Sequence, residues 1–334
     1  MKTANAPARP ESKAKNKTPR LIGWQGFTLN VPETFDLTGF SGTHEAGYFR
    51  VDDSEEQGVE IKWATEPKKA KKAPDVDARL QSYFKALHQA ARRKKLKIET
   101  READAPRRAI REERTALGFT WTGDRRAIGA IWYCRVCHRV VIAQMIGELG
   151  GPRSLGGVAE AVLSSLNCHS EDPAWQTWAL YDLCTEVPSE YALAGQQLMN
   201  VYLRLSFAHK SARLSVEQWA LANVARRDAY LDTWLAMNTK AEMGQARYKA
   251  EEGEAQGHPA LLLSGGVKLG RPAGELVQQV TRLQKPATRF SGVAWECEPS
   301  NKLYLVEGFR PRSAPDVARE VAKRTRCHGF DTVE

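Results

Sequence analysis

The chain carries one pattern twice: IGWQGFTLNVPETFDLTG at residues 22–39 and WALYDLCTEVPSEYALAG at residues 178–195. Both copies contain Val-Pro, then an aromatic residue, a leucine and a glycine, at a constant offset of 156 residues. Proline cannot extend a β ladder and holds its predecessor in extended geometry. Each copy therefore predicts a strand that ends at Val-Pro.

Further blocks of the chain recur in the same order. Because collinear repeats of this kind indicate duplicated structural units, the sequence predicts an internal duplication. The predicted organisation is a disordered basic tail at 1–20, a first repeat at 21–169, a linker at 170–177 and a second repeat at 178–334. The matching blocks are Trp63-Ala64 with Trp219-Ala220, Arg126-x-x-Gly129-x-x-Trp132-x-Cys134 with Arg289-x-x-Gly292-x-x-Trp295-x-Cys297, and Cys168-His169 with Cys327-His328.

Strand and helix patterns alternate in a similar way within each repeat. Short strands follow one another at hairpin spacing, and a helix with an apolar stripe is predicted after Asp75. In the second repeat, a long polar helix is predicted over about 220–250, and each repeat ends in a closing helix. The predicted class is α+β: two tandem homologous units, each an antiparallel sheet with helices packed on one face.

This order of elements resembles the PsbP/DcrB-like superfamily. The resemblance is carried by the strand that ends at Val31-Pro32 with Phe35, and by its second copy at Val187-Pro188 with Tyr191. A hairpin, a helix, a sheet and a closing helix then follow. The resemblance implies tandem domains with a binding or assembly role, and it implies no catalytic residues.

Composition indicates a globular protein that does not span a membrane. The 334 residues are 42% hydrophobic and 27% charged, and no apolar run approaches the roughly 20 residues of a membrane helix. The first twenty residues contain six Lys/Arg and no apolar core of a secretory signal. We therefore expect a cytoplasmic protein, in which six cysteines serve as thiols or metal ligands more readily than as disulfides.

Four cysteines occupy duplicated positions: Cys134 and Cys168 in the first repeat, Cys297 and Cys327 in the second. We expect each pair to meet inside its repeat as paired structural cysteines. Three interpretations remain open at this point. The pairs are reduced and packed as small apolar residues, they form a disulfide in each repeat, or they contribute to a zinc site.

The zinc hypothesis concerns the first repeat. Cys134 and Cys137 form a C-x2-C motif, Cys168 offers a third thiolate, and His138 or His169 would be the fourth ligand. The preferred set is Cys134, Cys137, Cys168 and His169. In the second repeat Ser300 replaces Cys137, so that repeat is expected to lack a fourth ligand. The sequence predicts either no cofactor or one structural zinc.

The charge distribution suggests an acidic partner. The formal net charge is +9, and residues 68–97 contain eleven basic side chains. Such clusters bind acidic proteins, or nucleic acid by counterion release.

No P-loop, dinucleotide, H-E-x-x-H or G-x-S-x-G motif is present in the sequence. We therefore expect a non-enzymatic binding or assembly module, with a zinc-stabilised nucleic-acid-associated protein as the alternative. The candidate contact residues are Lys68, Lys69, Lys71, Lys72, Arg92, Arg93, Lys94, Lys95 and Lys97.

Overall fold

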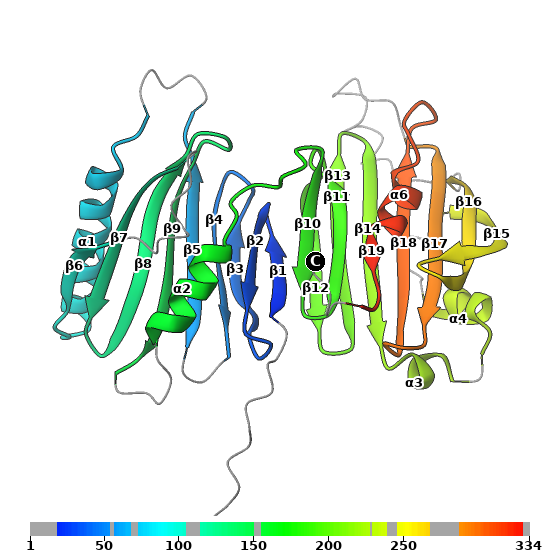
Figure 1. Cartoon of the computed structure of the whole chain (residues 1–334). Helices are drawn as coiled ribbons and strands as arrows, with labels where there is room; N and C mark the ends of the chain where they lie inside the picture. Colours follow the sequence, from blue (N-terminus) through cyan, green and yellow to red (C-terminus); the bar gives the residue numbers. More distant parts are fainter. Residues whose placement is uncertain are drawn as a thin grey trace, which may run out of the picture.

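The computed structural model describes residues 19–53, 57–67, 73–104, 114–149, 155–227, 229–238, 246–267 and 287–329. Across these residues, nineteen strands form three antiparallel sheets, and five helices accompany them (Figure 1). The protein is therefore nearer to an all-β fold than to the predicted α+β class. Part of the difference is that a stretch predicted as one strand is a hairpin, and a stretch predicted as helix is a strand.

The repeated pattern at the start of each repeat forms a β-hairpin. In the first copy, Gln25 and Gly26 have φ angles of 53° and 83°, the left-handed geometry that two-residue hairpin turns require. The hairpins belong to a five-stranded sheet between the two large sheets, in the order β19-β11-β10-β1-β2. Its strands are β1 (Arg20–Trp24), β2 (Phe27–Val31), β10 (Trp175–Leu180), β11 (Leu183–Pro188) and β19 (Thr325–Arg326).

This small sheet joins the two halves of the chain. β1 pairs with β10 through Gly23 and Ala179, which are equivalent positions of the repeated pattern. The neighbouring side chains Trp24 and Trp178 meet edge to face, with ring centroids 5.3 Å apart. Tyr181 adds a hydrogen bond from its hydroxyl to the Leu37 carbonyl at 2.8 Å. The halves are thus connected by a shared sheet and a shared apolar core.

The two seven-stranded sheets have the same strand order when each is read from its first strand. The first runs β3 (Asp36–Gly42), β4 (Ala46–Asp52), β5 (Gly58–Thr65), β9 (Arg139–Glu148), β8 (Arg125–Cys134), β7 (Arg114–Thr122) and β6 (Glu99–Ala103). The second runs β12 (Ala192–Met199), β13 (Tyr202–His209), β14 (Ala212–Ala220), β18 (Lys302–Arg310), β17 (Arg289–Cys297), β16 (His258–Val267) and β15 (Ala246–Ala255).

Helices cover both faces of the first large sheet, which corrects the prediction that they pack on one face. Successive residues of a strand point to opposite faces. In β8, Ile131 and Tyr133 pack in the same core as α1 (Val76–Arg93), whereas Ala130 and Trp132 pack in the core that contains α2 (Leu155–Ser165). A strand of a sheet that is buried on both faces needs apolar residues at odd and at even positions, and β8 has them at both.

The second large sheet is arranged similarly. The closing helix α6 (Val317–Lys323) shares the extended core, and α3 (Ala222–Arg226) and α4 (Leu231–Asn238) contribute to a separate core on the other face. The predicted long helix over 220–250 was wrong, because Ala246–Ala255 is an edge strand. Most side chains of that strand are exposed, so they carry no alternating apolar signal.

Candidate metal centres

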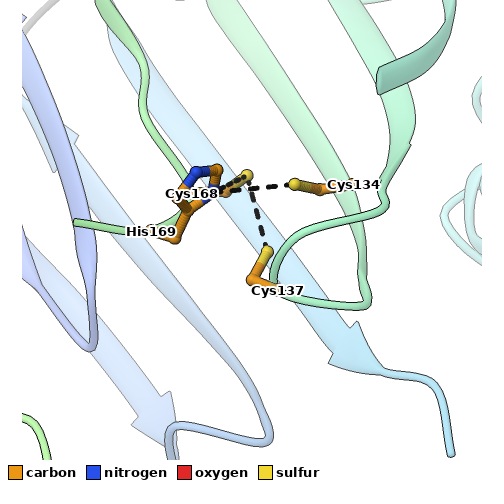
Figure 2. A group of neighbouring side chains, drawn as sticks. All are labelled: Cys134, Cys137, Cys168 and His169. Carbon is orange, nitrogen blue, oxygen red and sulfur yellow. Dashed lines mark hydrogen bonds between the residues drawn. The ribbon is translucent and has the colours of Figure 1, made fainter. Parts of the chain in front are cut away.

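A first cluster of cysteine and histidine side chains lies at one end of the first large sheet. Cys134, Cys137, Cys168 and His169 point toward one another (Figure 2), and their ligand atoms all lie within 4.8 Å of one another. The Cys137 and Cys168 sulfurs are 3.7 Å apart. His169 Nδ1 lies 3.6 Å from the Cys134 sulfur and 3.7 Å from that of Cys168. The arrangement could hold a metal ion.

Three separate segments bring these ligands together. Cys134 ends β8, Cys137 lies in the turn between β8 and β9, and Cys168-His169 follows α2. The segment after α2 is tied to β2 by two backbone hydrogen bonds between Thr28 and Asn167, of 2.8 and 3.0 Å. That attachment fixes the place of the next two residues, which is why adjacent Cys168 and His169 both reach the cluster.

The sequence left the fourth ligand open between two histidines, and the structure brings His169 to the cluster. His138 has a left-handed backbone, and its Nδ1 hydrogen bonds with the Tyr133 hydroxyl at 2.9 Å. All six cysteines lie in the described part of the chain and are free thiols. The cluster is therefore a group of thiols and an imidazole rather than a disulfide.

The hydrogen bonds within the cluster favour a negative charge on Cys134 and a positive charge on His169. Hydrogen bonds with the Cys134 and Cys168 sulfurs raise the pKa of His169 to about 10. Hydrogen bonds from Cys137 and Cys168 hold the pKa of Cys134 far below its ordinary value. The same hydrogen bonds raise the pKa of Cys137, because it donates in them, and Cys137 keeps its proton. The group thus stabilises a thiolate at Cys134, and thiolates are the form of cysteine that binds metal.

Two buried arginines surround the first cluster. Arg114, the first residue of β7, lies opposite Cys134 of β8, and its Nη2 donates to the Leu166 carbonyl at 3.0 Å and to the Cys168 sulfur at 3.8 Å. Arg139 donates to the Cys168 carbonyl at 3.1 Å and stacks on Phe27. Buried cations next to sulfur ligands compensate negative charge at the cluster.

A second cluster occupies the corresponding end of the second large sheet. It consists of His258, Cys297, Cys327 and His328. His328 Nδ1 lies 3.5 Å from the Cys297 sulfur, 3.2 Å from that of Cys327 and 3.3 Å from His258 Nε2. Burial raises the pKa of Cys327 to about 12. His328 is exposed, so this cluster is more open to solvent than the first.

The prediction that the second repeat lacks a candidate for the fourth ligand was wrong, because His258 of β16 lies with the other three side chains. His258 is the first residue of β16 and follows the turn Gln256-Gly257. Gln256 Nε2 donates to the Ala322 and Lys323 carbonyls at 3.1 and 2.8 Å, which holds this hairpin against the end of α6. No cysteine spacing marks His258. The β16–β17 register, whose pair nearest the cluster is Ala260 with Trp295, aligns His258 with Cys297 when it is continued by two residues.

The structure describes only part of the predicted basic contact set. Lys68, Lys69, Lys71 and Lys72 lie outside the described residues. The other members are exposed at and just beyond the C-terminal end of α1, where positive charge also stabilises the helix. They are Arg92, Arg93, Lys94, Lys95 and Lys97.

Among the described residues, no helix combines the length and the apolarity needed to cross a membrane.

Comparisons with known proteins give little beyond a weak likeness of fold. No family model matches the chain, and no curated protein matches it in sequence. Among solved structures, 48% of this chain aligns with 99% of the solution structure of cyanobacterial PsbP (CyanoP) from Synechocystis sp. PCC 6803. The TM-score is 0.34 and the identity 10%. The resemblance seen in the sequence therefore stands only as a weak likeness of fold, and it carries no argument about function.

Proposed function

We propose that this protein is a non-enzymatic binding or assembly module. Each of its two large sheets would carry a structural zinc ion at one end. Cys134, Cys137, Cys168 and His169 would hold the first ion, and the second cluster would hold the other. Zinc would supply a cross-link between strand, hairpin and post-helix segment. The equal strand order of the two sheets supports an internal duplication, from which both centres would descend.

The spacing of the ligand atoms supports zinc. A tetrahedral ion with bonds of about 2.3 Å to sulfur and about 2.0 Å to nitrogen sets ligand atoms ~3.8 Å apart for two sulfurs and ~3.3 Å apart for two nitrogens. The Cys137–Cys168 pair is 3.7 Å apart, and the His258–His328 nitrogens are 3.3 Å apart. Both clusters therefore have dimensions that would accept the ion with little movement.

The observation that carries the proposal is that the two repeats differ at two neighbouring positions, and that the two differences balance each other in charge. The second repeat has Ser300 in place of Cys137. Arg114 is paired with Cys134 in the first sheet, and the β16–β17 register, continued two residues beyond Ala260–Trp295, aligns His258 with Cys297 in the second. With Zn²⁺ bound, Cys137 would also lose its proton, and three thiolates and a histidine around the ion would leave one negative charge, which Arg114 would compensate. Two thiolates and two histidines leave none, so the arginine is not needed. A packing role for the cysteines alone would not require this pairing of changes.

We expect two zinc ions per chain in protein purified without a metal-affinity tag. The variant His258→Ala should retain one, because the first centre does not use that side chain, and Cys137→Ser should retain one for the opposite reason. Elemental analysis of zinc per chain measures both. His209→Ala is the matched control, since His209 lies on β13, outside both clusters, and should keep two ions. A wild type with no zinc, or equal zinc content in all four proteins, would contradict the proposal.

The binding partner is proposed to be an acidic protein that contacts the exposed basic residues after α1. The nearest acidic residue in sequence, Glu99, ion pairs with Arg101 at 3.3 Å rather than with that cluster. Nucleic acid is the second candidate partner, because five consecutive or nearly consecutive cations suit a phosphate backbone as well.

A salt series separates the two candidates. Reversing the charge of Arg92, Arg93, Lys94 and Lys95 to glutamate should leave folding intact, since all four side chains are exposed. If nucleic acid is the partner, retention on immobilised DNA should fall steeply with salt, and the variant should lose it. With an acidic protein as partner, we expect little retention of either protein at about 150 mM salt. Strong retention that is equal in wild type and variant would rule out this surface.

A further inference from the structure

A cavity of about 800 Å³ opens on the second large sheet, at the end of the strands opposite the metal cluster. Its lining combines five basic side chains with one carboxylate and two serines. The residues that line it are Arg247, Tyr248, Lys249, Ser264, Gly265, Arg289, Phe290, Ser291, Arg310, Arg312 and Asp316. None of these residues belongs to either metal cluster.

Strand register arranges the cavity in two rows. Arg247, Gly266, Arg289 and Arg310 are direct neighbours across β15, β16, β17 and β18. Like charges directly opposite each other destabilise a sheet, and Arg289 faces Arg310 across a strand spacing of about 5 Å. The glycine leaves a gap between the arginines. A row of this kind costs stability unless an anion lies among the guanidinium groups.

The next row forms the floor of the cavity. Lys249, Ser264, Ser291 and Gly308 are neighbours across the same four strands. Lys249, Ser264 and Ser291 line the cavity, whereas Gly308 packs against α6, where an added Cβ would lie 3.3 Å from the Ala318 Cβ. Because they are on the same face as the arginines, two residues away along each strand, the hydroxyl groups and the guanidinium groups face the same space.

The one carboxylate of the lining does not neutralise the arginines. Asp316 accepts a hydrogen bond from the Ser291 hydroxyl at 2.6 Å, and it lies 3.8 Å from Arg310 Nη2 and 3.7 Å from Arg319 Nε. Arg310 also donates to the Ala314 carbonyl at 2.7 Å. Within the described residues, Arg247, Lys249 and Arg289 have no acidic partner, so their charge is available to a ligand.

The first large sheet provides an internal comparison at the same register. Its first row reads Glu99, Thr122, Arg126 and Gly147, with one acidic and one basic side chain. Its second row reads Arg101, Thr120, Ile128 and Met145. Ile128 and Met145 stand at the positions that Ser291 and Gly308 have in the second sheet. The run of basic side chains in the first row is therefore specific to the second sheet, and the strand order shared by the two sheets does not require it.

We propose that this cavity binds a small molecule bearing phosphate groups. Guanidinium groups match phosphate oxygens in a two-pronged geometry, and a ligand with two or more negative charges would relieve the repulsion in the arginine row. The Ser264 hydroxyl would donate to a further phosphate oxygen, since the Ser291 hydroxyl already donates to Asp316. The volume suits a small organic phosphate.

Fructose 1,6-bisphosphate tests the proposal by isothermal titration, with fructose as the uncharged control, at fixed ionic strength. We expect one saturable site in the wild type and no heat with fructose. Arg289→Gln and Arg247→Gln should each weaken binding tenfold or more. The matched variant is Arg126→Gln, which removes the arginine at the same sheet position of the first repeat and should change affinity less than twofold.

Any of three results would overturn the proposal, the first two of which concern the bisphosphate alone. The first is equal weakening in Arg126→Gln and Arg289→Gln, and the second is the absence of saturable binding in the millimolar range. The third is binding of a single-stranded oligonucleotide that Arg289→Gln abolishes, without binding of the bisphosphate, which would assign the surface to nucleic acid. Circular dichroism of each variant confirms folding. All the substituted side chains of the second repeat are exposed, so unfolding is not expected to obscure the result.

Discussion

Replacing Cys168 with serine should release one zinc per chain and lower the free energy of unfolding by about 3–5 kcal/mol. Cys168 is fully buried, and its sulfur lies 3.7 Å from both Cys137 Sγ and His169 Nδ1. Serine is a poor zinc ligand, so the cross-link between the β8–β9 turn and the segment after α2 would be lost. The buried Arg114 would also lose a partner of opposite charge.

Chemical denaturation followed by tryptophan fluorescence, with zinc content measured on the same samples, checks this result. The matched control is Cys184→Ser. Cys184 is also buried, and burial raises the pKa of its thiol to about 11, but it belongs to neither cluster. It should keep two zinc ions and lose only the packing free energy of one sulfur. If both variants unfold at the same denaturant concentration and hold the same zinc, the cysteines are packing residues and the zinc proposal is wrong.

The sequence predicts correctly those elements that are marked by local signals, such as a helix cap or an apolar stripe. The helix after Asp75 is one example: Asp75 caps α1 by accepting from the Ala78 amide at 3.1 Å, and Leu80 and Phe84 are buried. The Val-Pro stretch is a weaker example. Its strand end at Val31 is correct, but the Gln25-Gly26 turn inside it went unrecognised, because a glutamine with positive φ is not a usual turn signal.

The features that the sequence did not predict depend on register and tertiary contact. The edge strand β15 is mostly polar and exposed, so its pattern cannot be distinguished from the polar face of a helix. His258 is recognisable as a candidate ligand only after β16 is aligned with β17. The arginine row of the cavity has the same origin, since Arg247, Arg289 and Arg310 are far apart in sequence and adjacent only across the sheet.

The junction between the two halves should be disrupted by the substitution Gly23→Ala. An added Cβ at Gly23 would lie 2.7 Å from the Thr177 carbonyl oxygen and 2.8 Å from the Ala179 nitrogen. These are backbone atoms of β10, so the clash cannot be relieved by a side-chain rotation. The pairing of β1 with β10 would have to open, and we expect a loss of about 2–4 kcal/mol of unfolding free energy.

Differential scanning calorimetry tests this, with Gly195→Ala as the matched control. Gly195 is also a strand glycine, in β12, but an added Cβ there meets nothing within 4 Å. We expect the control to unfold at the wild-type temperature or slightly above it, because alanine restricts the unfolded chain. Gly23→Ala should unfold at a lower temperature, and its transition should broaden or divide, because opening β1 from β10 separates two halves that otherwise share a sheet. Identical single transitions in both variants would show that the shared sheet does not couple the repeats.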